Sequence, residues 1–335
     1  MPARVAIVIP HWNRAELLAE TLASLGAQTY PIDRVIVMDN GSTDHSAAVA
    51  TRAGAETIAL GKNVGFAAAV NRGIEAARGS DYVGILNNDV TLREDWLARL
   101  IGALESGEPW FATGKLLDAE HRDRMEGSFD ALCRGGCAWR CGHGRPDSPL
   151  WNQARAISFA PLTAAVFRAG VFERVGLLDE SFESYLEDVD WGLRAASAGL
   201  SGRYIPEAVA YHKGSATLGR WHPETVRRMA RNQLLLVAKH YPENWVLRYG
   251  WSIFIAQTLW GLVALRHGAL LSYLAGKVEG MRYFHQTRVR QTRENPSARI
   301  PAGIAAILER SEREIYDIQK LTGFDLYWRL YFALT

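Results

Sequence analysis

The sequence predicts an α/β fold in which a mostly parallel sheet is flanked by helices. Four apolar, β-rich runs at residues 5–9, 34–38, 56–60 and 82–86 alternate with helix-like stretches such as residues 67–77. Strand–helix alternation of this kind gives right-handed crossovers and covers both faces of a parallel sheet. A chain of 335 residues is long enough for one large domain or two.

Residue spacing supports each assignment. Residues 5–9 are an unbroken apolar run, which is typical of a strand buried on both faces. Leu18, Leu22 and Leu25 recur at the spacing of one helix face. The further expected elements are a helix at 92–104, a strand at 110–113, a helix that ends near residue 199 and a helix at 223–241.

A polar loop follows each of the four strands. These loops carry Asn13, Asp39, Asn63 and Asp89. Each residue alone is an ordinary turn former. In a parallel sheet, however, loops of this kind lie at one edge, which is where such folds bind ligands.

Several function classes are excluded by their motifs. The first strand is not followed by GxGxxG, and the chain contains neither GxxxxGK[ST] nor GxSxG. A dinucleotide fold, a P-loop and a hydrolase elbow are therefore not supported. Lys and Arg number 38 against 36 Asp and Glu, so the net charge does not indicate a nucleic-acid partner.

Four short segments carry a family resemblance. They read Ile9-Pro10-His11-Trp12-Asn13, Asp39-Asn40-Gly41-Ser42-Thr43-Asp44, Asn63-Val64-Gly65-Phe66 and Asn87-Asn88-Asp89. In this order they resemble the family 2 glycosyltransferases of the GT-A fold, most closely the bacterial rhamnosyltransferase-like branch, over roughly residues 4–220. The resemblance implies a nucleotide-sugar donor held by Pro10, Asn13, Asp39, Asn63, Gly65 and Asn88.

The family's metal-binding DxD-type motif corresponds here to residues 87–89, where only Asp89 keeps a carboxylate. The resemblance implies that Asp89 holds Mg²⁺ or Mn²⁺ on the donor diphosphate and that His212 joins this site. An imidazole is a suitable second ligand where the motif has lost an acid. Such a cation stabilises the negative charge that develops on the departing diphosphate.

A second informative stretch places Glu187, Asp188 and Asp190 beside Trp191. Three acids at the start of a helix could simply favour its dipole. The stretch also resembles the family's acceptor-side ED motif, which implies that Asp188 is the general base and that Glu187 contacts the acceptor. Trp191 is a candidate for stacking on the acceptor sugar, and a core position is an equally good interpretation.

The cysteine content indicates a reducing compartment. Cys133, Cys137 and Cys141 are an odd number without CxxC spacing, which favours free thiols over a zinc site with His143. The N-terminus shows no signal-peptide pattern, so we expect a cytoplasmic protein.

The last third of the chain differs from the rest. We expect a GT-A domain at residues 1–220, with a nucleotide-sugar half at 1–117 and an acceptor half at 118–220, followed by a helical region at 221–335. Residues 245–293 combine apolar and tryptophan-rich stretches with arginines, which suggests helices at the inner face of the cell membrane. The alternative is an ordinary helical subdomain that packs on the sheet or forms a dimer.

These observations lead to an expected function and its rivals. The first is an inverting glycosyltransferase of cell-surface polysaccharide synthesis, with dTDP-rhamnose as a candidate donor and a glycan or lipid-linked acceptor. The enzymatic rival uses UDP-galactofuranose or UDP-N-acetylglucosamine instead. The non-enzymatic rival is a degenerate GT-A module that binds or scaffolds, which the missing first acid of residues 87–89 favours.

Overall fold

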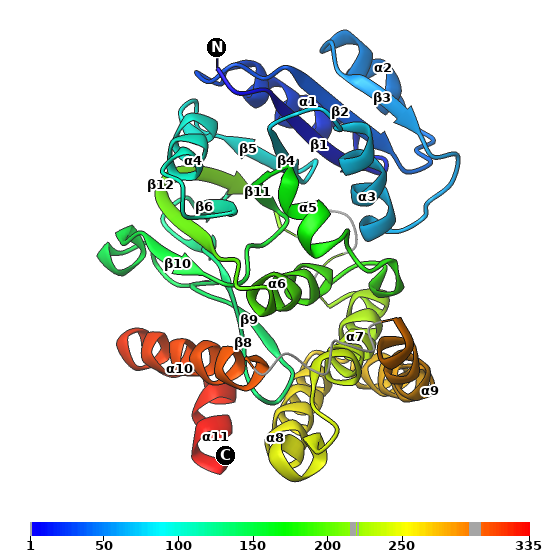
Figure 1. The fold of residues 1–335 in the computed structure, drawn as a ribbon, viewed down its shortest axis with the longest axis vertical. Coiled ribbons are helices and arrows are strands. Elements are labelled where there is room, and N and C mark those ends of the chain that lie inside the picture. Colours follow the sequence, from blue (N-terminus) through cyan, green and yellow to red (C-terminus); the bar gives the residue numbers. More distant parts are fainter. Residues whose placement is uncertain (1, 215–218, 220, 295–302) are drawn as a thin grey trace. The chain divides into compact units, whose positions relative to one another are not determined.

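The computed structural model describes residues 2–214, 219, 221–294 and 303–335 of the chain. The chain forms two compact units (Figure 1). Unit 1 comprises residues 1–130 and 142–217, and unit 2 comprises residues 131–141 and 218–335.

Unit 1 is built on a mixed sheet with the order β10-β12-β6-β11-β4-β1-β2-β3, to which β5 adds beside β12 and β7 beside β6. Its elements are β1 (Val5–His11), α1 (Ala15–Gly26), β2 (Arg34–Asp39), α2 (Ser46–Arg52), β3 (Glu56–Ala59), α3 (Phe66–Ala76), β4 (Tyr82–Leu86), β5 (Val90–Leu92), α4 (Trp96–Glu105), β6 (Phe111–Asp118), β7 (Met125–Gly127), β8 (Asp130–Leu132), η1 (Pro149–Asn152), β10 (Arg155–Ile157), β11 (Ala164–Arg168), α5 (Gly170–Val175), η2 (Glu180–Phe182), α6 (Glu187–Ser197) and β12 (Gly202–His212). Strands β4, β1, β2 and β3 run parallel, and β11 enters antiparallel between β4 and β6. The predicted α/β class is thereby confirmed, with helices flanking the sheet.

Alternation along β1 explains why helices cover both faces. Ile7 and Ile9 belong to the core cluster that α1 and α4 complete with their leucines, including Leu18 and Leu100. Val8 points the other way, and it lies where a Cβ on Gly73 of α3 would be. Since side chains alternate along a strand, an unbroken apolar run needs such a cover on each side.

The region after β4 differs from the prediction of a helix at 92–104. Residues Val90–Leu92 form strand β5, and α4 begins only at Trp96. β5 pairs antiparallel with the end of β12, so that Val90 lies opposite His212. A three-residue strand leaves no periodic signal, yet this one positions a residue of the predicted site.

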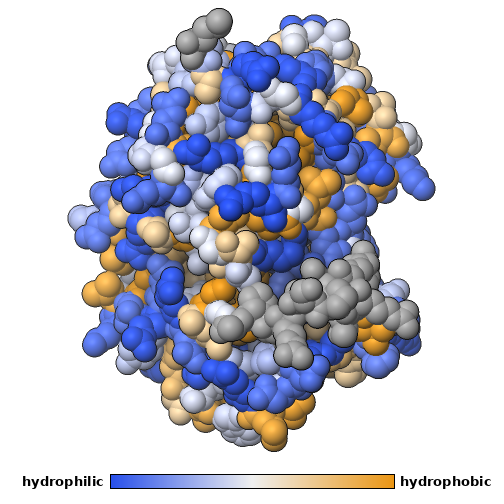
Figure 2. All heavy atoms as spheres, viewed as in Figure 1, coloured by the Kyte–Doolittle hydropathy of each residue, from blue (hydrophilic) through white to orange (hydrophobic). Residues whose placement is uncertain are grey.

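Unit 2 is helical, apart from the hairpin of residues 131–141. The hairpin pairs β8, of which only Asp130 belongs to unit 1, with β9 (Ala138–Arg140). The helices are α7 (Pro223–His240), α8 (Trp245–Arg266), α9 (Leu270–Glu294), α10 (Ile304–Thr322) and α11 (Leu326–Leu334). Figure 2 shows apolar side chains on the surface at the lower edge of the view, where Figure 1 places α8; Leu247 of this helix is 91% exposed. Among the described residues, none of the helices has the length and hydropathy needed to cross a bilayer.

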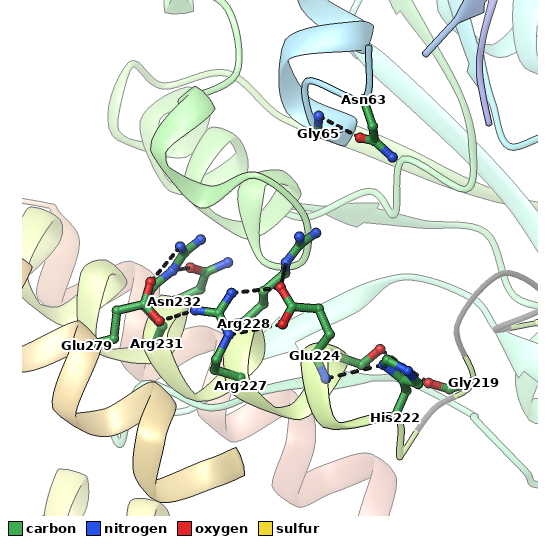
Figure 3. Close-up of polar contacts among 11 residues, drawn as sticks. Asn63, Gly65, Gly219, His222, Glu224, Arg227, Arg228, Arg231, Asn232 and Glu279 are labelled. Atoms are coloured by element: carbon green, nitrogen blue, oxygen red, sulfur yellow. Dashed lines mark hydrogen bonds and ion pairs between the residues drawn. The ribbon is translucent and has the colours of Figure 1, made fainter. Parts of the chain in front are cut away.

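Helices α7 and α9 are held together by charge and by close approach. The carboxylate of Glu279 on α9 accepts hydrogen bonds from Arg227 and Arg231 of α7, and Arg227 also pairs with Glu224 at 2.7 Å (Figure 3). A Cβ on Gly276 would lie 2.2 Å from the Arg227 carbonyl oxygen, so only glycine allows this helix contact.

The hairpin of residues 131–141 packs with the C-terminal helices, although the predicted division assigns it to the acceptor half. Leu132 N–H donates to Ser311 Oγ at 2.7 Å, and Arg134 is bonded to Glu312 at 2.6 Å. Tyr241 O–H donates to the Arg134 carbonyl at 2.9 Å. Cys133, Cys137 and Cys141 are buried free thiols in this hairpin.

Candidate active site

The loops after β1 and β2 are joined by hydrogen bonds at the carboxyl edge of the sheet. Asn13 Oδ1 accepts from Thr43 N–H at 2.9 Å, and Asn13 N–H donates to Ser42 Oγ at 2.8 Å. Asp39 Oδ1 in turn accepts from Ser42 N–H at 2.9 Å. Pro10, near the carboxyl end of β1, pairs in register with Met38 of β2. The predicted nucleotide residues of these two strands therefore lie together.

The loops after β2 and β3 are joined by Asn40, a residue that the sequence analysis did not single out. Its amide donates to Asn63 Oδ1 at 3.2 Å, and its Oδ1 accepts from Val64 N–H at 2.8 Å. Asn63 Oδ1 also accepts from Gly65 N–H at 3.0 Å (Figure 3). Asn40 is buried, and its hydrogen bonds hold the two loops together.

Gly65 connects this edge to the loop that precedes α6. The carbonyl oxygen of Glu183 accepts from Ala67 N–H at 3.0 Å, and a Cβ on Gly65 would lie 3.3 Å from the same oxygen. Gly65 also has a φ of +91°, which side-chain-bearing residues rarely adopt. Glycine is therefore favoured here by its backbone conformation and by the close approach of Glu183. This approach and the Ala67 hydrogen bond hold the loop before α6 beside the loop after β3.

Replacement of this glycine gives a prediction with a matched control. Gly65→Ala should lower stability by roughly 1–3 kcal/mol more than Gly79→Ala, because crowding against the Glu183 carbonyl is added to backbone strain. Gly79 has a φ of +93°, but a Cβ there meets nothing within 4 Å. Thermal and urea unfolding of both variants measures the difference. Equal losses would show that the contact with Glu183 does not constrain the loop.

Backbone strain is confined to two of these loops. Among the described residues, the non-glycine residues with positive φ are Asn13, Arg14, Glu183, Tyr185 and Leu186. Each such conformation costs about 1–3 kcal/mol and persists where the surrounding structure imposes it, commonly at functional sites. The two strained segments are the predicted nucleotide loop and the turn that leads into Glu187 and Asp188.

The three acids at the start of α6 have different surroundings. Asp190 is fully buried and forms an ion pair with Arg194 at 3.1 Å, so its carboxylate is structural. Glu187 is also buried, at 5% exposure. Asp188 is half-buried, and its Oδ1 accepts from Val189 N–H at 2.8 Å. Of the three carboxylates, that of Asp188 is the most accessible to a substrate.

Trp191 has the core position, which is one of the two interpretations that the sequence allowed. It is 3% exposed and packs edge-on against Phe111 and Phe167. The ring centre of Phe172 lies 5.7 Å from that of Trp191. Its indole N–H donates to the Gly176 carbonyl at 3.0 Å. The interpretation of Trp191 as an acceptor-stacking residue is therefore wrong, because the helix turns this side chain into the core.

A buried chain of hydrogen bonds connects the ends of β4 and β1. The Asn88 amide nitrogen lies 2.7 Å from His11 Nδ1, and His11 Nε2 lies 2.7 Å from Ser46 Oγ, which also contacts Asp44. Burial lowers the pKa of His11, against the opposing influence of the Asp44 and Asp39 carboxylates. A neutral His11 can accept from Asn88, so Asn88 is held at the edge while its predicted contact with the nucleotide stays a prediction.

His212 lies between two carboxylates. Its Nε2 is 3.2 Å from Asp89 Oδ1, and its Nδ1 is 3.4 Å from Glu126 Oε2. Burial alone would lower the pKa of His212, but the hydrogen bonds and charges of Asp89 and Glu126 raise it to about 10. The pairing of β5 with β12 brings Asp89 to His212, and Lys213 N–H donates to the Asp89 carbonyl at 3.1 Å. Glu126 comes from β7, which pairs with β6.

The Asp89–His212 pair can hold a divalent cation that displaces the proton from His212. Two ligands at 2.0–2.2 Å from an octahedral ion are roughly 3 Å apart, close to the 3.2 Å between Asp89 Oδ1 and His212 Nε2. Within the described ranges, no group of three His, Cys, Asp or Glu side chains surrounds one ion position. Such a site suits Mg²⁺ or Mn²⁺, which commonly combine few protein ligands with substrate phosphates and water.

Glu126, on β7, is a site residue that the sequence analysis missed. It approaches the ring nitrogen of His212 that faces away from Asp89, which is where a residue orients a metal-binding histidine. A polar cavity of about 380 Å³ opens beside it, lined also by Asp118, His121 and His143. No motif marks Glu126, because it lies 86 positions before His212 in an irregular part of the chain.

The raised pKa of His212 gives a pH-dependent stability. Since the folded value of about 10 exceeds the unfolded value of about 6.5, the contribution is complete below pH 6.5 and is lost as the pH rises towards 10. Unfolding in chelator-treated buffer should therefore require less urea at pH 9 than at pH 6.5. The slope should be shallower in Glu126→Gln. A wild-type stability that stays level across this range would contradict the ion-paired arrangement of His212.

Comparison with known proteins agrees with this geometry. Residues 6–124 match the family described as Glycosyl transferase family 2, and residues 82–285 match Glycosyl transferase family group 2. The Mycobacterium tuberculosis pre-mycofactocin glycosyltransferase is 30% identical over 220 residues, covering 65% of this chain and 44% of the relative. The N-acetylglucosaminyl-diphospho-decaprenol L-rhamnosyltransferase of the same organism is 29% identical over 278 residues, covering 74% and 87%.

Solved structures show the same fold. GalNAc-T7, crystallised with UDP, GalNAc and Mn²⁺, superposes with a TM-score of 0.64 at 13% identity, over 96% of this chain and 58% of that one. The chain thus spans less than two thirds of both this protein and the pre-mycofactocin glycosyltransferase. From its matched residues and its architecture, the chain belongs to the family 2 glycosyltransferases and has their GT-A fold.

Proposed function

We propose that this protein is an inverting glycosyltransferase that moves a sugar from a nucleoside-diphosphate donor to a hydroxyl group in cell-surface polysaccharide synthesis. The observation that carries the proposal is the Asp89–His212 pair, 3.2 Å apart, on the sheet edge that also holds Asn13, Asp39 and Asn63. Polar loops joined in this way along one edge form a surface suited to a nucleotide and its phosphates.

Each predicted nucleotide and metal residue has a role in this proposal. Asp39, Asn13 and Pro10 contact the nucleoside, while Asn63, Gly65 and Asn88 shape the loops around the diphosphate. Asp89 and His212 hold Mg²⁺ or Mn²⁺, and Glu126 orients His212. When bound, the cation would supply the positive charge that stabilises the departing diphosphate. The presence of UDP and Mn²⁺ in the GalNAc-T7 crystal supports a nucleotide and a divalent cation as ligands of this fold.

Asp188 completes the chemistry as the general base. The acceptor hydroxyl oxygen attacks the anomeric carbon as the bond to the diphosphate breaks, and Asp188 takes the hydroxyl proton. Attack from the face opposite the leaving group inverts the anomeric centre. Its partial exposure and its place after a strained turn support Asp188 over Asp190, while Glu187 is assigned to acceptor contact.

The acceptor is proposed to be a glycan or a lipid-linked sugar, with the enzyme bound at the inner face of the cell membrane. A relative that covers 74% of this chain adds rhamnose to N-acetylglucosaminyl-diphospho-decaprenol, as its name states. dTDP-rhamnose is therefore the first donor to test, with UDP-galactofuranose and UDP-N-acetylglucosamine as rivals. The exposed apolar residues of α8 support a membrane location.

A panel of nucleotide sugars tests the proposal. With Mn²⁺ present, one donor should raise the melting temperature and release its nucleoside diphosphate when an acceptor is added. Stabilisation by nucleotides without release from any donor, across both glycan and lipid-linked acceptors, would favour a non-catalytic binding module. The replacement of the first acid of the DxD-type motif by Asn87 is the observation that keeps this second function in consideration.

A further inference from the structure

Helices α8 and α9 each expose an apolar stripe. On α8 it consists of residues 247, 251, 254, 262 and 265, and on α9 of residues 271, 274, 278 and 281. Their exposure ranges from 45% for Val278 to 91% for Leu247. Spacings of three and four residues put each set on one helix face. Exposed apolar surface of this extent marks a binding site.

An open apolar cavity of about 740 Å³ lies between the two stripes. Its lining includes Phe254, Leu262 and Leu265 of α8, and Leu274, Met281 and Phe284 of α9. The cavity is thus a groove lined mainly by these two helices, with Leu234 of α7, and belongs entirely to unit 2. A volume of this size is ordinary for a ligand site.

Three polar side chains of the groove, those of Gln257, Tyr273 and Lys277, bond to the protein itself, and Thr258 also lines it. Lys277 Nζ donates to the Ala230 carbonyl at 2.9 Å, to Gln233 Oε1 at 2.8 Å and also to Gln257. Tyr273 O–H donates to the Gln257 carbonyl at 2.6 Å. Because these groups are satisfied, the groove presents hydrocarbon to its ligand, and an apolar chain loses no hydrogen bond on entering it.

The charge of unit 2 indicates an anionic partner. Its residues include 19 Lys and Arg against 9 Asp and Glu, whereas unit 1 has 19 against 27. Arg266 and Arg282 are exposed and lie next in sequence to Leu265 and Met281 of the stripes, whereas Arg248, beside Leu247, is paired with Glu309 at 3.5 Å. Cations at the margin of an apolar surface favour lipids with anionic headgroups. If a second copy used the same face, unit 2 of each copy, with a net charge of +10, would meet the other and repel it.

We propose that the groove between α8 and α9 binds the hydrocarbon chain of a phosphate-bearing membrane lipid, with the flanking arginines at its phosphate. The inference deepens the proposed function, on which it rests, by making this lipid the acceptor that carries the sugar. The groove would hold the acceptor by its hydrocarbon chain.

The test uses the full chain and two variants. In the groove variant, Leu262→Gln and Leu274→Gln are combined; both residues are exposed, at 55% and 47%, so the fold should tolerate the change. The control combines Leu321→Gln with Leu326→Gln, which are 70% and 65% exposed in the same unit but do not line the groove. The probe is a fluorescent polyprenyl phosphate, and its unphosphorylated alcohol is the second ligand.

The groove variant should bind the polyprenyl phosphate at least tenfold more weakly, since burial of two leucines against hydrocarbon is lost. The control should bind like wild type, and the alcohol should bind more weakly than the phosphate to all three proteins. In transfer assays, KM for a long-chain acceptor should rise in the groove variant while KM for a short, water-soluble acceptor stays unchanged.

Other outcomes would overturn the inference in distinguishable ways. Equal probe binding by wild type and the groove variant removes the groove as the site. If wild type does not bind the monomeric probe, but binds anionic vesicles and the groove variant does not, the stripes contact a bilayer surface instead. A dimer that dissociates in the groove variant assigns them to a second copy. If the groove binds the polyprenyl phosphate but no sugar is transferred to any acceptor, the groove stays a lipid site and only the proposed function is contradicted.

Discussion

Asp188→Asn should abolish sugar transfer while leaving the fold and donor binding intact. Removal of a general base typically costs about 10²–10⁴-fold in rate, because the acceptor hydroxyl must then attack without losing its proton to the enzyme. Asp188 is half-buried, and its Oδ1 accepts a hydrogen bond from the neighbouring Val189 N–H, which an amide oxygen can also accept. The kcat of transfer and the Kd for nucleoside diphosphate, measured on the same preparation, give the two halves of the result.

Asp190→Asn is the matched control, two residues further along the same helix. Its carboxylate is fully buried against Arg194, so loss of its charge should destabilise the protein by about 3–5 kcal/mol. The melting temperature should therefore fall for Asp190→Asn and stay constant for Asp188→Asn. Transfer by Asp188→Asn at the wild-type rate would show that another group removes the proton.

Asp89→Asn should eliminate metal-dependent nucleotide binding. Without the carboxylate, one of two protein ligands is lost and His212 keeps only Glu126 as an acidic neighbour. The loss of transition-state charge stabilisation amounts to several kcal/mol, on the order of 10²–10³-fold in kcat/KM. Calorimetric titration of Mn²⁺ in the presence of nucleoside diphosphate should show strong binding by wild type and little by the variant.

Asp81→Asn provides the control for this experiment. Asp81 lies at the opposite end of β4 and accepts from Arg4 N–H at 2.8 Å, so it should not influence metal binding. Mn²⁺ should also bind wild type far more weakly without nucleotide, since Asp89 and His212 alone do not complete an octahedral shell. Strong Mn²⁺ binding by Asp89→Asn would place the cation elsewhere.

The sequence predicted the parallel half of the sheet well, because the β1 and β4 runs are apolar on both faces and end abruptly in polar loops. It failed where few residues make an element. β5 has three residues and no periodicity, and the hairpin at 131–141 is held by contacts with α10 that no local pattern reveals.

The position of a residue relative to a strand end also explains which site candidates the sequence could suggest. Asp39 ends β2, and Asn13, Asn63 and Asp89 lie in the loops that follow β1, β3 and β4, so their meeting at one edge follows from topology. Asn40 and Glu126 act by supporting other residues, and nothing in the linear sequence distinguishes such a role. Trp191 was misjudged because an aromatic residue beside acids fits a sugar site and a core equally well, and only its burial against Phe111 and Phe167 decides.

A crystal structure with Mn²⁺ and a nucleoside diphosphate would test the central claim most directly. We predict the ion on Asp89 and His212, the nucleoside against the loops of Asp39 and Asn13, and Asp188 facing the outer phosphate across the space that a sugar would fill. A nucleotide bound away from this edge, or an Asp188 carboxylate that points away from the phosphates, would contradict it.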